Sequence, residues 1–201
     1  MPRFGAIICD LLTALLDSWS LWGDVAGDEE RGARWRRTSL EIIYAAGAYR
    51  PYEDIVAEAA AAVDLGPEHA AELLGRWDEL EPWPEAPGVL RDLRADHRIA
   101  LVTNTSHDLA RRAARRLGVR IDVLVSAEAC GFYKPRPEPY RAAMSAVGGP
   151  AVFLAGSAGD VPGACAVGLP VIWHNRVGAA AAGGSPLAVI SSLEPLAGLV
   201  R

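Results

Sequence analysis

The sequence contains little cysteine, and this excludes two common ways of stabilising a fold. Its three cysteines, Cys9, Cys130 and Cys165, are odd in number and lack CxxC spacing. A disulfide framework needs pairs and a structural zinc site needs clustered ligands, so neither is predicted. The four histidines are scattered without ligand spacing, so we assign none of them to a metal. A reducing cytoplasm is the expected location.

The sequence also lacks a long apolar run and an excess of basic residues. No stretch approaches the roughly 20 apolar residues of a membrane helix, and Asp10 interrupts the apolar amino terminus, so neither a membrane partner nor a signal peptide is predicted. The 20 Lys and Arg residues against 25 Asp and Glu residues give a net charge of −5, which argues against a nucleic-acid partner. With 51% apolar and 22% charged residues, the chain of 201 residues is expected to form a sizeable core.

Short apolar runs alternate with helical segments along most of the chain. The runs lie at residues 4–9, 98–103, 121–126, 151–155 and 169–173. They are too short for helices and lack polar alternation, which is typical of parallel strands buried on both faces. The helical segments lie at residues 107–117, 137–147 and 159–167. This order predicts an α/β protein with a doubly wound, Rossmann-like parallel sheet.

The interval between the first two runs breaks this alternation. It contains no good strand candidate, and its amphipathic segments lie at about residues 27–48, 53–63 and 67–80. We therefore expect a helical cap of residues 17–83, inserted after the first strand. Residues 1–16 and 84–201 are then the sheet core.

Polar residues are expected where the strands end. They are Asp10, Thr103, Asn104, Lys134, Ser157 and Asp160. Ligands of doubly wound sheets bind beyond the carboxyl ends of strands, so these side chains predict one site. An apolar rim that includes Leu11 and Leu12 makes Asp10 a poorly solvated carboxylate, and Lys134 keeps it ionised. Such a carboxylate acts as a nucleophile and forms a covalent ester.

Each of these residues also has a purely structural interpretation. Asp10 suits a turn, and Thr103 and Asn104 suit the cap of the helix near residue 107. Lys134 suits an exposed loop and Asp160 a helix cap. Their joint placement at strand ends favours the site over these alternatives.

Five segments resemble motifs of the haloacid dehalogenase-like hydrolase superfamily, and most closely its L-2-haloacid dehalogenase branch. Residues 10–17 (DLLTALLD) are similar to D-x-Y-G-T-L-x-D, residues 35–41 (WRRTSLE) to W-R-x-K-Q-L-E, residues 103–106 (TNTS) to S-N-G-S, residues 131–135 (GFYKP) to V-Y-K-P, and residues 155–164 (AGSAGDVPGA) to S-x-N-A-x-D-x-x-G-A. The resemblance covers nearly the whole chain and implies a hydrolase.

The resemblance also implies a role for each site residue. Asp10 attacks the carbon that carries the leaving group, and water activated near Asp160 hydrolyses the resulting ester. Arg36 of the cap receives the halide or the anionic substrate, Asn104 holds the leaving group and Thr103 the substrate carboxylate.

Four further positions complete the assignment that the resemblance implies. Lys134 orients the nucleophile, Leu12 lines the substrate pocket beside Leu11, and Ser157 replaces the asparagine that helps to place the hydrolytic water.

Departures from the phosphatases of this superfamily bear on the cofactor. Leu12 stands where phosphatases carry a general acid, and Ala155 and Gly156 stand where they carry magnesium-binding acids. We therefore expect no cofactor, with a weak Mg²⁺ site through Asp10 and Asp160 as the alternative.

The sequence thus favours a metal-independent, 2-haloacid dehalogenase-like hydrolase acting on a small carboxylic acid. A magnesium-dependent phosphatase with an atypical first motif and a catalytically reduced scaffold that binds a ligand are the alternatives. The expected partner is a small-molecule substrate, and the resemblance implies a homodimer formed through the cap.

Overall fold

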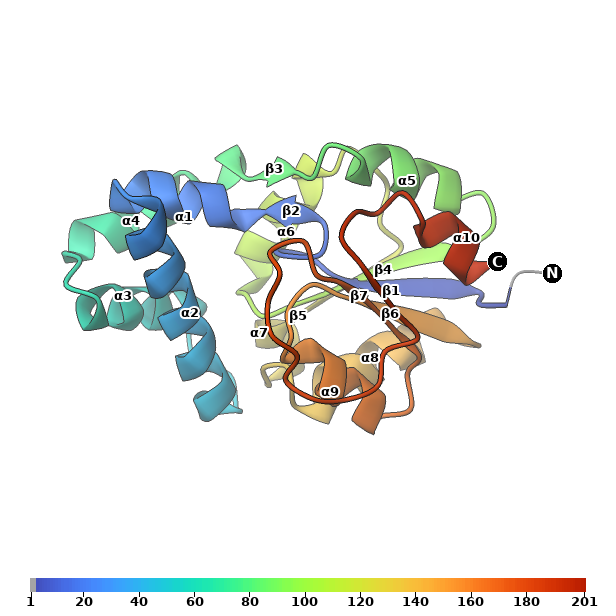
Figure 1. Cartoon of the computed structure of the whole chain (residues 1–201). Coiled ribbons are helices and arrows are strands. Elements are labelled where there is room, and N and C mark those ends of the chain that lie inside the picture. Colours follow the sequence, from blue (N-terminus) through green and yellow to red (C-terminus); the bar gives the residue numbers. More distant parts are fainter. Residues whose placement is uncertain (1–2) are drawn as a thin grey trace.

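A parallel six-stranded sheet lies at the centre of the structure, a computed structural model that describes residues 3–201 (Figure 1). The strands follow the order β5 (Val123–Ser126), β4 (Arg98–Thr103), β1 (Ala6–Asp10), β6 (Ala151–Ala155), β7 (Val171–His174) and β8 (Ala188–Ile190). The chain adds β4 and β5 on one side of β1, and then adds β6, β7 and β8 on the other side of β1. The order therefore reverses between β1 and β6, where doubly wound folds bind their ligands.

Buried strands alternate their side chains between two helical layers. In β1, Ile7 and Cys9 belong to the apolar cluster under α5 (Ala86–Leu93), α6 (His107–Arg116) and α10 (Leu196–Val200), whereas Ala6 and Ile8 pack towards α8 (Pro137–Val147) and α9 (Asp160–Ala166). The strand is fully buried on both faces, which explains its continuous apolar sequence.

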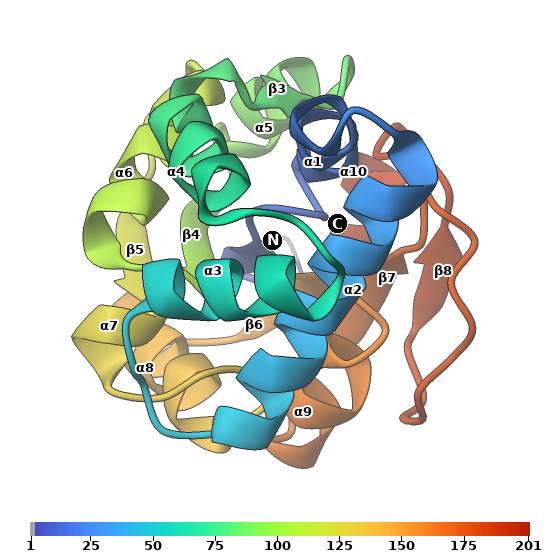
Figure 2. The same cartoon turned by 90° about the vertical axis from the view of Figure 1, so that its left-hand side faces the viewer.

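Residues 18–79 form a separate group of helices at one end of the sheet (Figures 1 and 2). They are α1 (Ser18–Ala26), α2 (Glu29–Ala46), α3 (Tyr52–Ala62), α4 (Pro67–Gly75) and a short 3₁₀ turn, η1 (Trp77–Glu79). Viewed from this end, α2 and α3 lie in front of the strands (Figure 2). The predicted fold class, an α/β sheet with a helical cap after the first strand, is confirmed.

Two short strands join the cap to the core. β2 (Leu16–Asp17) pairs antiparallel with β3 (Glu81–Pro82), so the two connections lie side by side. The sequence prediction of no strand in this interval is therefore wrong at β3, whose two residues are too few to give a pattern. The paired connections support the proposed cap boundaries of residues 17 and 83.

Some short elements were not predicted from the sequence. They are α1, α5, β8, α10 and the four-residue helix α7 (Ala127–Cys130). Asp17 is the sequence signal that could have indicated the start of α1. Its side chain caps this helix by accepting hydrogen bonds from the backbone N–H groups of Trp19 and Ser20. Along residues 3–201, no helix is both long and apolar enough to cross a bilayer.

Candidate active site

Two carboxylates and one lysine meet at the point where the strand order reverses. Asp10 is the last residue of β1, Asp160 begins α9 after β6, and Lys134 lies in the loop between α7 and α8. The Lys134 Nζ atom donates hydrogen bonds to Oδ1 of Asp10 at 2.7 Å and to Oδ2 of Asp160 at 2.9 Å. All three side chains are buried, so the exposed-loop interpretation of Lys134 is wrong.

The lysine shifts the proton affinities of the two carboxylates in different directions. Burial alone would raise the pKa of Asp10, but the Lys134 charge and hydrogen bonds from Lys134 and Thr13 hold it below its usual value. Burial raises the pKa of Asp160, and the charge of Asp10 adds to this although Lys134 opposes it. Burial would lower the pKa of Lys134, but the two carboxylates raise it, so the lysine stays charged. Asp10 is thus the firmly ionised carboxylate, and Asp160 is the stronger base.

The second oxygen of Asp10 is held by the turn that follows β1. The Thr13 hydroxyl donates a 2.6 Å hydrogen bond to Oδ2, and the backbone N–H groups of Thr13 and Ala14 approach the same atom at 3.2 Å and 3.3 Å. Asp10 therefore accepts hydrogen bonds within a turn, as its structural interpretation predicts. It also contacts Lys134, as its functional interpretation predicts. Its Oδ2 is surrounded by donors that also suit an ester carbonyl oxygen.

Asn104 and Tyr140 hold the lysine and the second carboxylate in place. The Asn104 side-chain amide accepts a hydrogen bond from the Lys134 N–H at 2.7 Å and donates one to the Lys134 carbonyl at 3.0 Å. The Tyr140 hydroxyl donates a 2.9 Å hydrogen bond to Oδ1 of Asp160. Asn104 thus positions Lys134, a contact that was not predicted. Neither Asn104 nor Asp160 caps a helix with its side chain, and α6 is preceded by Ser106.

Arg36 extends from the cap helix α2 and is buried. Its guanidinium carbon lies 4.9 Å from the ring centre of Trp19 and 5.6 Å from that of Trp22, and its Nε atom is buried without a hydrogen-bond partner. Burial lowers the pKa of Arg36, although a guanidinium remains charged at neutral pH. A buried cation with an unused donor is suited to an anionic ligand.

These groups surround a small cavity of about 30 Å³, which we call the reaction chamber. Its walls are Asp10, Leu12, Thr13, Arg36, Leu40, Ile43, Tyr44, Tyr52, Thr103, Asn104, Lys134, Ser157 and Asp160. The chamber is large enough for about one water molecule or an ion of similar size. Among the predicted site residues, only Leu11 lies outside this wall, because its side chain is fully buried in the core.

Sequence reasoning missed most of the cap residues that line the chamber. Leu40 and Tyr44 follow Arg36 at intervals of four residues on α2, so they lie on the same helix face. That spacing could have identified both once Arg36 had been chosen. Tyr52 could not have been identified in this way, because it belongs to another helix and only the tertiary packing places it here.

The donor set of the site does not fit a magnesium ion. The four carboxylate oxygens of Asp10 and Asp160 already accept hydrogen bonds from Lys134, Thr13 or Tyr140. Within the part of the chain that the structure describes, no cluster of three or more His, Cys, Asp or Glu side chains is arranged to hold a metal. Mg²⁺ needs carboxylates free to coordinate it, and the Lys134 ammonium lies between the two that are present.

Comparisons with known proteins agree with this architecture. The profile of haloacid dehalogenase-like hydrolases matches residues 12–168. The (S)-2-haloacid dehalogenase 1 of Pseudomonas sp. (strain CBS-3) is 27% identical over 170 residues, which cover 77% of this chain and 75% of that protein.

Solved structures of L-2-haloacid dehalogenases have the same fold. The enzyme from Xanthobacter autotrophicus with chloropropionic acid covalently bound superposes with a TM-score of 0.86 and 21% identity, covering 99% of both chains. The L-2-haloacid dehalogenase RSc1362 superposes with a TM-score of 0.86 and 23% identity, covering 98% of both chains.

An α/β core with a helical cap and an aspartate at the end of β1 defines a capped hydrolase. Because the profile covers most of its length, the chain belongs to the haloacid dehalogenase-like hydrolase family. The predicted resemblance and the predicted enzyme class, a hydrolase, are confirmed, and the chain is similar to L-2-haloacid dehalogenases.

Proposed function

We propose that this protein is a metal-independent 2-haloacid dehalogenase that acts on a small carboxylic acid through an ester on Asp10. The observation that carries this proposal is the ionised Asp10, held by Lys134 in a small chamber that the buried Arg36 also lines. Leu12 also lines this chamber, at the position where phosphatases carry a general acid. A halide ion is stable as released, so its departure needs neither that acid nor a metal.

In the first step, Oδ1 of Asp10 attacks the carbon that carries the halogen. A carbon–oxygen bond forms as the carbon–halogen bond breaks, and the halide leaves with the bonding electron pair. We assign the attack to Oδ1 because Oδ2 is already held by three donors from the turn after β1. Arg36 is placed to attract the substrate carboxylate or the departing halide, and Thr103 lines the same chamber.

In the second step, water hydrolyses the ester. Asp160 accepts a proton from water, and its raised pKa suits it to this role. The water oxygen bonds to Cγ of Asp10, and the negative charge that develops on Oδ2 faces the N–H groups of Thr13 and Ala14. Collapse of this adduct breaks the bond between Cγ and Oδ1, Asp160 returns its proton to Oδ1, and the 2-hydroxy acid departs carrying Oδ1. One proton is released overall, and the carboxylate of Asp10 is restored with an oxygen from water.

The test is bromide release from (S)-2-bromopropionate in the presence of a chelator. Wild-type protein should release bromide and form lactate, whereas Asp10→Asn should not. Mass spectrometry of protein quenched during turnover should detect the propionate ester on the peptide that contains Asp10. Bromide release that stops on chelation would contradict the metal-independent reaction. Magnesium-dependent phosphate release from a phosphate ester, without bromide release, would favour the phosphatase alternative, and ligand binding without turnover by either protein would favour the binding scaffold.

Two further predictions accompany this function. We propose a cytoplasmic location, which the three unpaired cysteines support. We also propose a homodimer formed through the cap, for which size-exclusion chromatography with light scattering is the test.

A further inference from the structure

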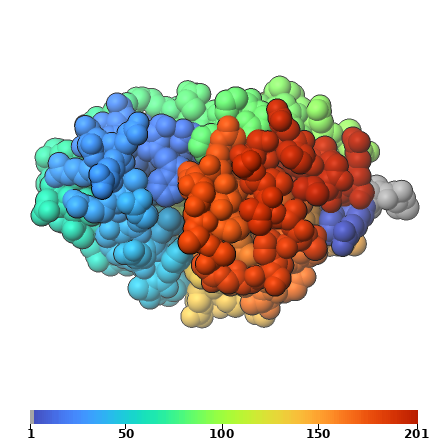
Figure 3. All heavy atoms as spheres, in the orientation of Figure 1, coloured from blue at the N-terminus to red at the C-terminus, as the bar shows by residue number. Residues whose placement is uncertain are grey.

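A second and much larger cavity lies beside the reaction chamber. It has a volume of about 1150 Å³ and opens to the surface between the cap helices α1 and α2 and the core segment 177–182. We call it the outer cleft. The cap and the carboxyl-terminal part of the core meet along this side of the molecule (Figure 3). Clefts of this size between two structural units are typical of small-molecule sites.

Hydrogen bonds tie the cap to the core on its other sides. They join Tyr133 to Gly47, Tyr49 to Gly131, Ser106 to Glu53, Trp77 to Leu109 and Arg112 to Leu74. Within residues 3–201, no hydrogen bond joins α1 or the first half of α2 to segment 177–182. The side with the outer cleft is therefore the one where cap and core are least constrained.

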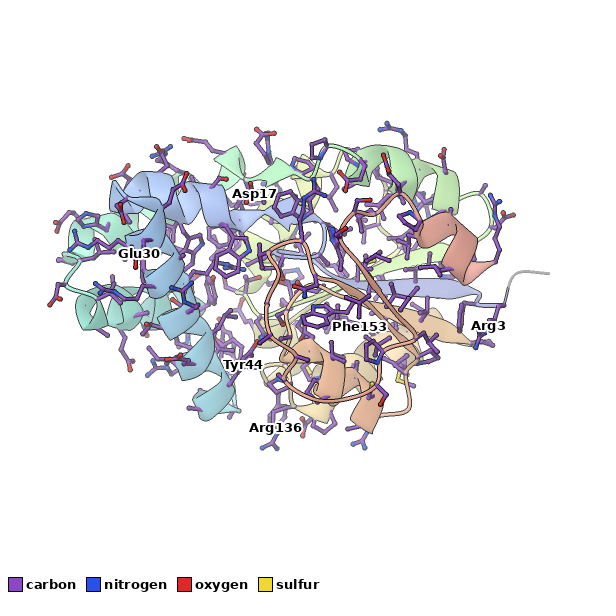
Figure 4. The ribbon with its side chains drawn as sticks, viewed as in Figure 1. Arg3, Asp17, Glu30, Tyr44, Arg136 and Phe153 are labelled. Carbon is purple, nitrogen blue, oxygen red and sulfur yellow. The ribbon has the colours of Figure 1, made fainter. Side chains whose placement is uncertain are left out.

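Tyr44 separates the outer cleft from the reaction chamber. It lies on α2 at the side that faces the core (Figure 4), and it lines both cavities together with Thr13, Leu40 and Ser157. Its hydroxyl donates a long hydrogen bond of 3.4 Å to the Ser157 hydroxyl. This long hydrogen bond is weak, and the Tyr44 ring also packs closely against Gly159.

Gly159 leaves the space that the Tyr44 side chain occupies between the two cavities. A Cβ atom at this position would lie 2.7 Å from the Tyr44 hydroxyl oxygen, which is closer than real Cβ atoms approach. Small residues continue along the outer cleft, including Ala33, Ala158 and Ala180. The volume of the cleft therefore follows from short side chains on both walls.

Resting on the proposed function, we propose that the outer cleft holds the substituent on the reacting carbon of the substrate, and that Tyr44 moves aside to admit it. The substrate carboxylate lies beside Arg36 and the reacting carbon beside Asp10, and the displaced Tyr44 side chain gives these groups room that the 30 Å³ reaction chamber lacks. The preferred substrate class is then 2-halo acids with an extended substituent.

The lining favours an apolar substituent over one that carries a negative charge. Trp19, Leu40 and Val177 supply apolar surface, and the exposed part of Val177 amounts to 52% of its surface. The charged residues of the cleft are Asp24, Asp28, Glu29, Glu41 and Arg37. This acidic excess repels a substituent that ends in a second carboxylate.

The test compares (S)-2-bromopropionate, (S)-2-bromooctanoate and 2-bromooctanedioate as substrates. We expect wild-type protein to show a higher kcat/KM for bromooctanoate than for the other two. Ala33 lies seven residues before Leu40 on α2, about 10 Å along the helix axis. Ala33→Trp should therefore fill the far part of the cleft and lower kcat/KM for bromooctanoate at least about tenfold, as expected when two methylene groups lose their burial. Its kcat/KM for bromopropionate should change less than about twofold, within the effect of a typical surface substitution.

Two further variants control this result. Ala180→Trp fills the cleft from the opposite wall and should reproduce the effect of Ala33→Trp. Ala45→Trp lies on the same helix as Ala33 but is exposed and outside the cleft, so it should change neither substrate. The proposal would be overturned if Ala33→Trp and Ala180→Trp lowered kcat/KM equally for both substrates or changed neither value. It would also be overturned if Ala45→Trp changed the selectivity in the same way.

Calorimetric binding of unhalogenated octanoate and propionate separates this proposal from the proposed function. Wild-type protein should bind octanoate more tightly, and Ala33→Trp should abolish the difference. If no protein releases bromide but this binding pattern appears, the outer cleft binds the substituent although the dehalogenase function fails. If bromide is released but octanoate binds no more tightly than propionate, the outer cleft proposal fails alone.

Discussion

The hydroxyl of Tyr140 donates a 2.9 Å hydrogen bond to Oδ1 of Asp160, the carboxylate whose pKa is raised by burial. This bond stabilises the ionised carboxylate and therefore holds its pKa below the value that burial alone would give. Tyr140→Phe should raise the pKa of Asp160 further. Because Asp160 must be ionised to accept a proton, the acid limb of the kcat profile should move to higher pH by about one unit, as expected for a hydrogen bond to a charged group.

The matched control for this shift is Tyr133→Phe. Tyr133 is also fully buried, but its hydroxyl donates to the backbone carbonyl of Arg50 instead of a carboxylate. The acid limb of the kcat profile of Tyr133→Phe should lie at the same pH as that of the wild type. An unchanged profile in Tyr140→Phe, or an equal shift in both variants, would contradict the role of Asp160 as the base.

Thr13 provides a test of the second step. Its hydroxyl and N–H both face Oδ2 of Asp10, the oxygen that becomes the ester carbonyl in the proposed reaction. Thr13→Val should slow ester hydrolysis about 100-fold, because a donor to the developing charge is lost. The ester should then accumulate and be visible by mass spectrometry after rapid quenching, whereas Thr13→Ser should behave as the wild type. A Thr13→Val protein that turns over without accumulation would contradict this assignment.

Lys134 should be important for stability as well as activity. Its ammonium is the shared partner of two buried carboxylates, so Lys134→Met leaves these charges uncompensated. We expect the free energy of unfolding to fall by about 3–5 kcal/mol, measured by urea denaturation at neutral pH. Adding Asp160→Asn to this variant should restore part of the loss, since one of the two uncompensated charges is then removed. A Lys134→Met protein as stable as the wild type would mean that the carboxylates are not buried as charges.

His174 should make stability depend on pH. Its Nδ1 lies 2.8 Å from the carbonyl oxygen of Ala14, so Nδ1 carries the proton, and the buried Nε2 has no hydrogen-bond partner. Burial lowers the pKa of His174 below its ordinary 6.5. As the pH falls below about 6.5, the unfolded chain binds a proton that the folded protein does not, so stability decreases.

Thermal unfolding followed between about pH 5 and 8 measures this effect of the histidine. The Tm of the wild type should fall on the acid side of this range, and His174→Asn should reduce that slope. Parallel slopes in the wild type and His174→Asn would show that other groups cause the pH dependence.

The main sheet and the reacting groups were predictable because they depend on local patterns. Buried parallel strands give short apolar runs, and β1 ends where its run meets Asp10. The carboxyl ends of parallel strands share one edge, so Asp10 and Asp160 were expected together from their positions alone. The elements that were missed, such as β8, are too short or too exposed to produce a pattern.

The sequence by itself determined that Asp10 and Asp160 meet at one edge of the sheet, because both follow parallel strands and only the order of the elements is needed to place them there. Tertiary structure decided which residues surround the two aspartates. Tyr44 contacts Ser157, which lies 113 residues later in the sequence. The residue pattern of a single helix cannot predict a contact over such a separation. The shape of the outer cleft, and with it the substrate preference that we propose, depends on how the cap packs against the core and not on any motif.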